Sequence, residues 1–207
     1  MVAKYEEALH ESFAGMVREA DAFFMRSGRL MDTLRRLAER CTDAGIAYAI
    51  VGGMALGEHG YVRMTEDVDV LLTAEGLQRF RDQLVGRGYV ATHPGAQRTF
   101  RDTESGVRLE FLVTGEYPGD GKPKAIRFPE PLGAGTEIDG VRVLTLPRLI
   151  ELKLASGMSA PHRLRDLADV QEVIKAKQLD AAFATQLDPS VRGTYLELEQ
   201  AVRQSAS

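Results

Sequence analysis

Residues 67–72 read Asp-Val-Asp-Val-Leu-Leu, and this segment constrains the fold more than any other part of the chain. Side chains two apart in a strand point to the same face, so Asp67 and Asp69 are expected about 7 Å apart at their Cα atoms. The unbroken apolar residues that follow are typical of a strand buried in a sheet. The segment therefore predicts a strand of a sheet whose N-terminal end carries two carboxylates and lies in a solvent-accessible site.

Apolar periodicity predicts helices before and after a small sheet. Apolar residues recur at helical spacing over residues 3–26 and 29–44, and a short apolar strand is expected over residues 46–51. Gly52-Gly53 then turns the chain into a short helix near residues 54–59. Further strands are expected over residues 88–93, 97–102, 107–113 and 141–145, and further helices over residues 74–87, 147–156, 161–177 and 189–203.

Residues 115–135 are so rich in glycine and proline that a long loop is expected there. The loop contains Lys122, Lys124 and Arg127, and is either a functional segment that meets RNA phosphate or a plain surface excursion. The order of elements indicates an α+β or α/β protein with a small mixed sheet and helical ends. We expect three parts, namely an N-terminal helix over 1–28, a core over 29–145 and a C-terminal helical region over 146–207.

The composition excludes several classes of protein. The chain has 207 residues, of which 44% are hydrophobic and 27% are charged, so a globular protein is expected rather than a disordered one. A net charge of -4 argues against a nonspecific nucleic-acid coat. The single Cys41, expected in the core, rules out an internal disulfide framework and a thiolate zinc cluster. No apolar run approaches the ~20 residues that span a bilayer, and no signal peptide is seen, so a cytoplasmic protein without a membrane partner is expected.

Three features carry candidate chemistry. Asp67 and Asp69 repel each other on one face, and a divalent cation would relieve that repulsion; a solvated strand end is the alternative. Gly52-Gly53, between a strand and a helix, lets backbone N–H groups approach an anion, or is only a turn. Glu110 lies in an apolar strand opposite Leu109 and Phe111, so it either joins a site or faces solvent.

The combination of these features resembles a known family. Val51-Gly52-Gly53, a spacer, and then Asp67-Val68-Asp69-Val70 are similar to the motif of the nucleotidyltransferase superfamily that includes DNA polymerase beta. The stretch from Val51 to Leu72, with Arg63 and Thr65 inside it, looks like the small bacterial members related to abortive-infection and toxin-type nucleotidyltransferases. The resemblance is most specific over residues 46–72 and implies an α+β fold, a nucleotidyltransferase core with a small mixed sheet.

The resemblance also implies the roles of particular residues. Asp67, Asp69 and Glu110 are then the catalytic acids and the ligands of Mg²⁺ or Mn²⁺. Lys153 shares a mainly apolar helical stripe, so its amine either reaches solvent or binds nucleotide phosphates. The nucleotide-binding residues implied are Gly52, Gly53, Arg63, Thr65, Lys153, Asp166 and Asp169. The two last aspartates are alternatively anchors for Lys153 or local partners of arginines on their own helix.

Two positions depart from the family pattern, because Gly53 offers no serine hydroxyl and the third acid is Glu110 where aspartate is usual. The implied reaction transfers a nucleoside monophosphate from a triphosphate such as ATP to an acceptor hydroxyl, with pyrophosphate release. RNA 3′ ends, including tRNA, or a protein are the favoured acceptors, and a small molecule such as an aminoglycoside is the other candidate.

The alternatives to a transferase are a catalytically inactive module that binds a nucleotide or a partner, and an unrelated α+β protein. A homodimer or an antitoxin partner, docked on the N-terminal helix, is also left open.

Overall fold

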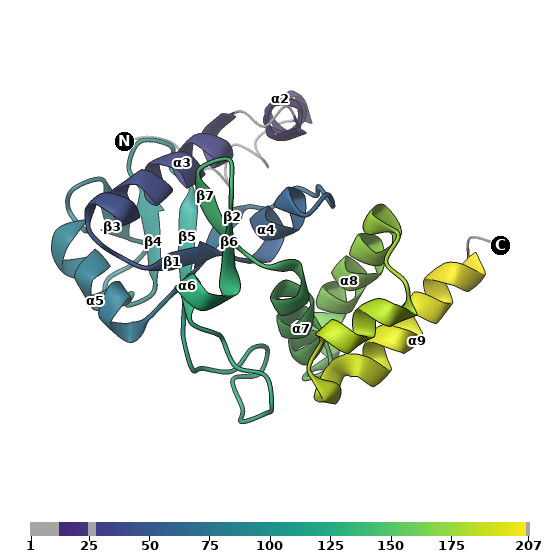
Figure 1. Ribbon diagram of the computed structural model, residues 1–207. Helices are drawn as coiled ribbons and strands as arrows, with labels where there is room; N and C mark the ends of the chain where they lie inside the picture. Colours follow the sequence, from purple (N-terminus) through teal and green to yellow (C-terminus); the bar gives the residue numbers. More distant parts are fainter. Residues whose placement is uncertain (1–12, 25–27, 206–207) are drawn as a thin grey trace.

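The computed structural model describes residues 13–24 and 28–205 (Figure 1). The expected helix over residues 3–26 therefore lies partly outside the described residues, and its described part is α2 (Phe13–Phe24). The other helices are α3 (Gly28–Asp43), α4 (Gly52–Glu58), α5 (Ala74–Gln83), α6 (Pro131–Ala134), α7 (Leu146–Gly157), α8 (Leu164–Lys177) and α9 (Pro189–Ser205), with 3-10 turns at Pro161–Arg163 and Ala181–Gln186.

The strands are β1 (Tyr48–Ile50), β2 (Asp67–Leu72), β3 (Tyr89–Ala91), β4 (Thr99–Asp102), β5 (Arg108–Val113), β6 (Gly135–Ile138) and β7 (Val141–Leu144). They form one mixed sheet in the order β3-β4-β5-β2-β1-β7-β6. β2 lies in the middle, antiparallel to β1 and parallel to β5. The expected α+β class with a small mixed sheet and helical ends is confirmed.

Helices α3 and α5 cover one face of the sheet. Leu34, Leu37 and Cys41 of α3 are buried against Val68 and Val70 of β2. At the far side of this layer, rings from α5, β3, β4 and β5 pack with centroids 4.5–5.6 Å apart, and these rings belong to Phe80, Tyr89, Phe100 and Phe111. Apolar residues at every second position of β2, β4 and β5 supply this core, because alternate strand residues share a face.

The other face is covered over β1, β2 and β7 by a second core that includes α4, α7 and α8. Leu71, Leu144, Leu149 and Val170 are buried there. Thr145 alone separates β7 from α7, and α7, α8 and α9 pack together on one side of the sheet (Figure 1). α2 contacts α3, and Arg29 pairs with Glu19 at 2.8 Å.

Several expected boundaries differ from the structure. The helix expected over 74–87 ends at Gln83, because Gly86 takes a positive φ and Val85 forms a bridge to Tyr89. β6 lies at the end of the segment expected as a loop, where pairing with β7 outweighs a sequence with few strand formers. The same segment also contains the short helix α6, so the expected loop is irregular only up to residue 130. Ile126 and Phe128 are buried and tie this irregular part to the core. The helix expected over 161–177 begins as a 3-10 turn and becomes α8 at Leu164.

Candidate active site

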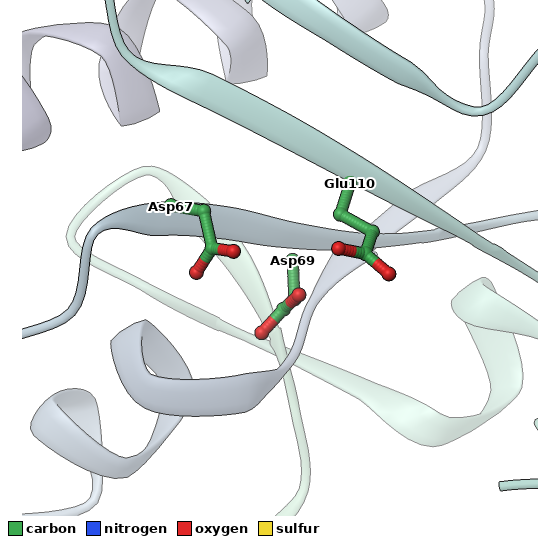
Figure 2. A group of neighbouring side chains, drawn as sticks. All are labelled: Asp67, Asp69 and Glu110. Carbon is green, nitrogen blue, oxygen red and sulfur yellow. The ribbon is translucent and has the colours of Figure 1, made fainter. Parts of the chain in front are cut away.

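Three carboxylates converge at the beginning of β2. The parallel pairing of β2 with β5 sets Asp69 beside Glu110 and Asp67 beside Arg108. Oxygen atoms of Asp67, Asp69 and Glu110 all lie within 4.8 Å of one another (Figure 2). Their neighbours along each strand, Val68 and Leu109, point to the other face and are buried. The structure thus brings together the three acids that the sequence singled out.

The acids disturb one another's protonation. Burial raises the pKa of Asp69 to about 7, and the charges of Asp67 and Glu110 add to that effect, while Lys153 and Arg63 oppose it. Burial likewise raises the pKa of Asp67, although a hydrogen bond from Thr65 works in the opposite direction. A cluster with this electrostatic strain is relieved when a cation enters.

The hydroxyl of Thr65 donates to Asp67 Oδ1 at 3.2 Å and is almost completely buried. Thr65 therefore orients a carboxylate, and the nucleotide contact that the family resemblance implied for it stays a prediction. Gly53 lies close by, since a β-carbon at Gly53 would stand 3.0 Å from the Thr65 Cβ atom. The small residue at position 53 lets the start of α4 pack against the segment that leads into β2.

Position 52 has no room for a side chain, so a glycine is required there. Its φ of 61° lies in the left-handed region, and a β-carbon there would overlap the Oδ2 atom of Asp69. The glycine therefore lets the backbone approach the carboxylate of Asp69, in the same turn that the sequence indicated as an anion cradle.

Two cations of the site are held by two aspartates. Arg63 binds Asp169 through two hydrogen bonds of 2.8 and 3.0 Å. Lys153 Nζ donates to Asp169 at 2.7 Å and to Asp166 at 3.0 Å, and Asp166 also accepts a bond of 2.6 Å from Ser156. Lys153 is only 7% exposed, so its amine lies among carboxylates and does not extend into solvent.

Asp169 is the centre of this network and is 2% exposed. Burial alone would raise its pKa, but hydrogen bonds and charges from Arg63 and Lys153 hold the pKa below its ordinary value. The expected anchoring of Lys153 by Asp166 and Asp169 is what the structure shows. Arg63 belongs to the segment before β2 and Asp169 to α8, so the pair joins the sheet to the C-terminal helices.

A cavity of about 550 Å³ lies over the acids. The sheet contributes Asp67, Asp69 and Glu110 to its lining, whereas the C-terminal helices and the turn before α8 contribute the cationic groups of Lys153, Arg163 and Arg165. Glu116, Tyr117 and Phe128 line the side formed by the 115–129 loop. The cavity therefore has an acidic wall on the sheet and a largely basic wall on the helices.

A second cavity of about 490 Å³, beside α2, reaches two of the three acids, Asp67 and Asp69. Met16, Met64 and Thr65 line it, together with Asp67, Asp69 and the two arginines that also line the first cavity, Arg63 and Arg165. The first cavity alone is lined by Gly52, Gly53, Lys153 and Asp166. Asp169 binds Arg63 and Lys153 but lines neither cavity. Arg165 lines both cavities and makes no ion pair with another residue of the ranges 13–24 and 28–205. The sequence resemblance had not assigned it to nucleotide binding.

Two further features were missed from the sequence. Arg108 donates to Glu110 at 2.6 Å, and the alternation of β5 already placed both side chains on one face. Tyr117 lies under Arg127, with the guanidinium carbon 4.8 Å from the ring centroid.

Lys124, which the sequence singled out as a basic residue of the loop, binds Asp120 of the same loop at 2.6 Å and the Pro118 carbonyl at 2.7 Å. Lys124 therefore holds the loop together.

The chain thus combines an α+β fold with three clustered carboxylates, and these carboxylates lie under a cavity whose opposite wall is largely basic. No family model matches the chain, and no curated protein matches it significantly. Among the solved structures similar to it are proteins described as nucleotidyltransferases or nucleotidyltransferase-like.

One similar structure is ANT(2″)-Ia in complex with adenylyl-2″-tobramycin, with 15% identity, coverage of 86% of this chain and 97% of that chain, and a TM-score of 0.49. Another is an antigenic nucleotidyltransferase-like protein from Paracoccidioides brasiliensis, with 18% identity, coverage of 70% and 74%, and a TM-score of 0.47. A third is JHP933 from Helicobacter pylori, with 18% identity, coverage of 82% and 88%, and a TM-score of 0.44. No helix in the described part of the chain is long and apolar enough to cross a membrane.

Proposed function

We propose that the chain is a metal-dependent nucleotidyltransferase, which moves a nucleoside monophosphate from a nucleoside triphosphate to an acceptor hydroxyl. The observation that carries this proposal is the convergence of Asp67, Asp69 and Glu110 under one cavity whose opposite wall is basic. A triphosphate needs cationic contacts along its length and a divalent metal at the phosphorus that reacts. The two walls of this cavity provide for both needs.

The donor set fits Mg²⁺ or Mn²⁺. Asp67, Asp69 and Glu110 offer carboxylate oxygens within 4.8 Å of one another, and hard divalent cations prefer oxygen ligands. The raised pKa of Asp69 supports the same assignment, because a bound cation would favour the charged carboxylate. When bound there, such a metal would neutralise the phosphates and lower the pKa of the acceptor hydroxyl.

The chain's own groups have separate tasks in the transfer. The acceptor oxygen forms a bond to the α-phosphorus while the bond from that phosphorus to the bridging oxygen breaks, and pyrophosphate leaves with the electron pair. We assign Glu110 to accept the proton of the acceptor hydroxyl, because its side chain is 38% exposed and lies on β5, beside the two aspartates of β2. Lys153, Arg163 and Arg165 face the leaving phosphates from the opposite wall.

We extend the proposal to the nucleotide and to the partners. ATP is the proposed donor, and an RNA 3′ end such as that of tRNA, or a protein hydroxyl, is the proposed acceptor, with an antitoxin or a second copy of the chain as regulator. We also propose that residues 29–145 act as the catalytic core and residues 146–207 as the region that supplies the basic wall, after an N-terminal segment over 1–28.

Label transfer tests the reaction. The full chain is mixed with each α-³²P nucleoside triphosphate, Mg²⁺ or Mn²⁺, and total cellular RNA. We expect label on RNA or protein with the wild type and none with the Asp67→Asn/Asp69→Asn variant, which keeps the shape of both side chains. Equal labelling by both proteins would contradict the proposal, and thermal unfolding of the variant confirms that it is folded.

A second candidate function is a catalytically inactive module that binds nucleotides. The ion pair between Arg108 and Glu110, and the neutralisation of Arg63 and Lys153 by buried aspartates, favour it. Such a module would bind the triphosphate in a metal-dependent manner without transferring label. Equilibrium binding of a fluorescent triphosphate analogue beside the transfer assay separates the two functions.

A further inference from the structure

The side of the first cavity that the 115–129 loop forms is apolar and aromatic. Tyr117 and Phe128 of the loop line it, and Leu112 follows Glu110 on the same face of β5. The apolar cluster that contains Leu112 and Phe128 includes two further lining residues from α7, Leu149 and Leu152. Phosphates bind to charged groups and not to apolar surface, so this side of the cavity fits a different part of a ligand.

Tyr117 has a cation against its ring. The guanidinium carbon of Arg127 lies 4.8 Å from the ring centroid. Tyr117 lines the cavity and Arg127 does not, so the guanidinium supports the ring from outside the cavity. The acidic residue on this side, Glu116, is paired with Arg98, and its charge is therefore compensated beside an anionic ligand.

The loop holds Tyr117 in place through both of its neighbours in the chain. The carbonyl of Glu116 accepts a hydrogen bond of 2.8 Å from the backbone N–H of Phe128. The carbonyl of Pro118 accepts one of 2.7 Å from Lys124 Nζ. A ring whose backbone is already fixed loses little conformational freedom when a ligand binds to it.

We propose that Tyr117 stacks on the base of the nucleoside triphosphate, and that this stacking makes the site prefer purine over pyrimidine triphosphates. The inference rests on the proposed function. Aromatic side chains bind nucleobases through their π faces, and one such contact contributes about tenfold in affinity. A purine offers two fused rings and a pyrimidine only one, so the larger base buries more surface against Tyr117.

The layout of the cavity sets the order of the ligand's parts. In this arrangement the α-phosphate lies at the three acids, and the wall that carries Lys153 and Arg163 binds the phosphates that follow it. Leu112 lies two residues after Glu110, about 7 Å further along β5 towards the loop. That step leaves room for a ribose between a phosphate at Glu110 and a base at Tyr117.

Tripolyphosphate, which has the phosphates of the donor without its ribose and base, provides the test. Isothermal titration calorimetry with the full chain and Mg²⁺ measures the binding of tripolyphosphate and of α,β-methylene ATP, which cannot transfer its nucleotide. We expect Tyr117→Leu to weaken binding of the ATP analogue about tenfold and to leave the affinity for tripolyphosphate unchanged. The unchanged affinity for tripolyphosphate also shows that the variant is folded.

Three further variants show whether the ring and its supporting cation act as proposed. Tyr117→Phe keeps the ring and should retain the affinity of the wild type for the ATP analogue. Arg127→Met should lose affinity by a smaller factor than Tyr117→Leu, because the ring stays but its support is removed. Lys122→Met is the matched control, since Lys122 is an exposed cation of the same loop and its loss changes the net charge equally.

The corresponding cytidine analogue tests the preference for a purine. The wild type should bind it more weakly than the ATP analogue, and Tyr117→Leu should narrow that difference. Equal affinity of the wild type for the two analogues would overturn the purine preference.

The tripolyphosphate comparison also separates this inference from the proposed function. An equal loss for both ligands in Tyr117→Leu, or an unchanged affinity for the ATP analogue, would overturn the inference and leave the transferase in place. Absence of Mg²⁺-dependent binding of either ligand by the wild type would overturn the proposed function, and the base site with it.

Discussion

The carboxylate of Asp69 occupies the position where a β-carbon of residue 52 would stand, so Gly52 and Asp69 form a matched pair. The left-handed backbone at Gly52 and the placement of the acid on β2 depend on each other. From the sequence alone, a glycine that lets the backbone approach a phosphate cannot be told from a glycine that leaves room for a neighbouring side chain. In this structure Gly52 leaves room for the carboxylate of Asp69.

We expect Gly52→Ala to weaken metal binding and to destabilise the fold by at least about 1 kcal/mol, because the new methyl group displaces Asp69 and the left-handed φ is strained. Gly57→Ala is the matched control in the same helix, since a β-carbon there meets nothing within 4 Å. The control should be neutral or stabilising by roughly 0.5–1 kcal/mol. Thermal unfolding and Mn²⁺ titration check both variants, and equal behaviour of the two would refute the pairing.

The raised pKa of Asp69 gives a pH dependence of stability. Its folded pKa of about 7 exceeds its ordinary value of 3.8, so between these two pH values the folded protein binds more protons at this site than the unfolded chain. The contribution of Asp69 to the free energy of unfolding therefore falls as the pH rises from about 4 to 7. We expect Asp69→Asn to become progressively more stable than the wild type over that range, measured by urea unfolding in EDTA. A pH-independent difference would contradict the assignment.

Loss of Asp169 should be strongly destabilising. Asp169→Ala leaves Arg63 and Lys153 without their shared buried carboxylate, and we expect a cost of about 3–5 kcal/mol in the free energy of unfolding. The control is Glu172→Gln on the same helix, where an exposed pair with Lys175 contributes less than about 1 kcal/mol. Lys153→Met in the Asp169→Ala background should recover part of the loss, and a purely additive effect would argue against the network.

Arg108 should restrain metal binding. Because its guanidinium binds Glu110 at 2.6 Å, a metal has to replace that bond to use the carboxylate. We expect Arg108→Met to tighten Mn²⁺ binding severalfold at low salt, and Glu110→Gln to weaken it. Electron paramagnetic resonance of free Mn²⁺ measures both. A weaker Mn²⁺ affinity in Arg108→Met would show that Arg108 supports the site instead.

The local parts of the fold and the site could be predicted from the sequence, since they follow from alternation. The bounds of β2 agree with the expected strand, and the acids at its start converge with Glu110 because β5 is its parallel neighbour. The ion pair of Arg63 with Asp169 joins residues 106 positions apart and leaves no local pattern. β6 was missed for the same reason, because its strand conformation comes from the partner strand.

Asp169 ties together three parts of the chain that are far apart in the sequence. It lies on α8, accepts two hydrogen bonds from Arg63 of the segment before β2, and accepts a third from Lys153 of α7. Asp169 itself does not line the first cavity. The spacing between the acidic and the basic wall is thus fixed in part by a buried side chain that stands behind both.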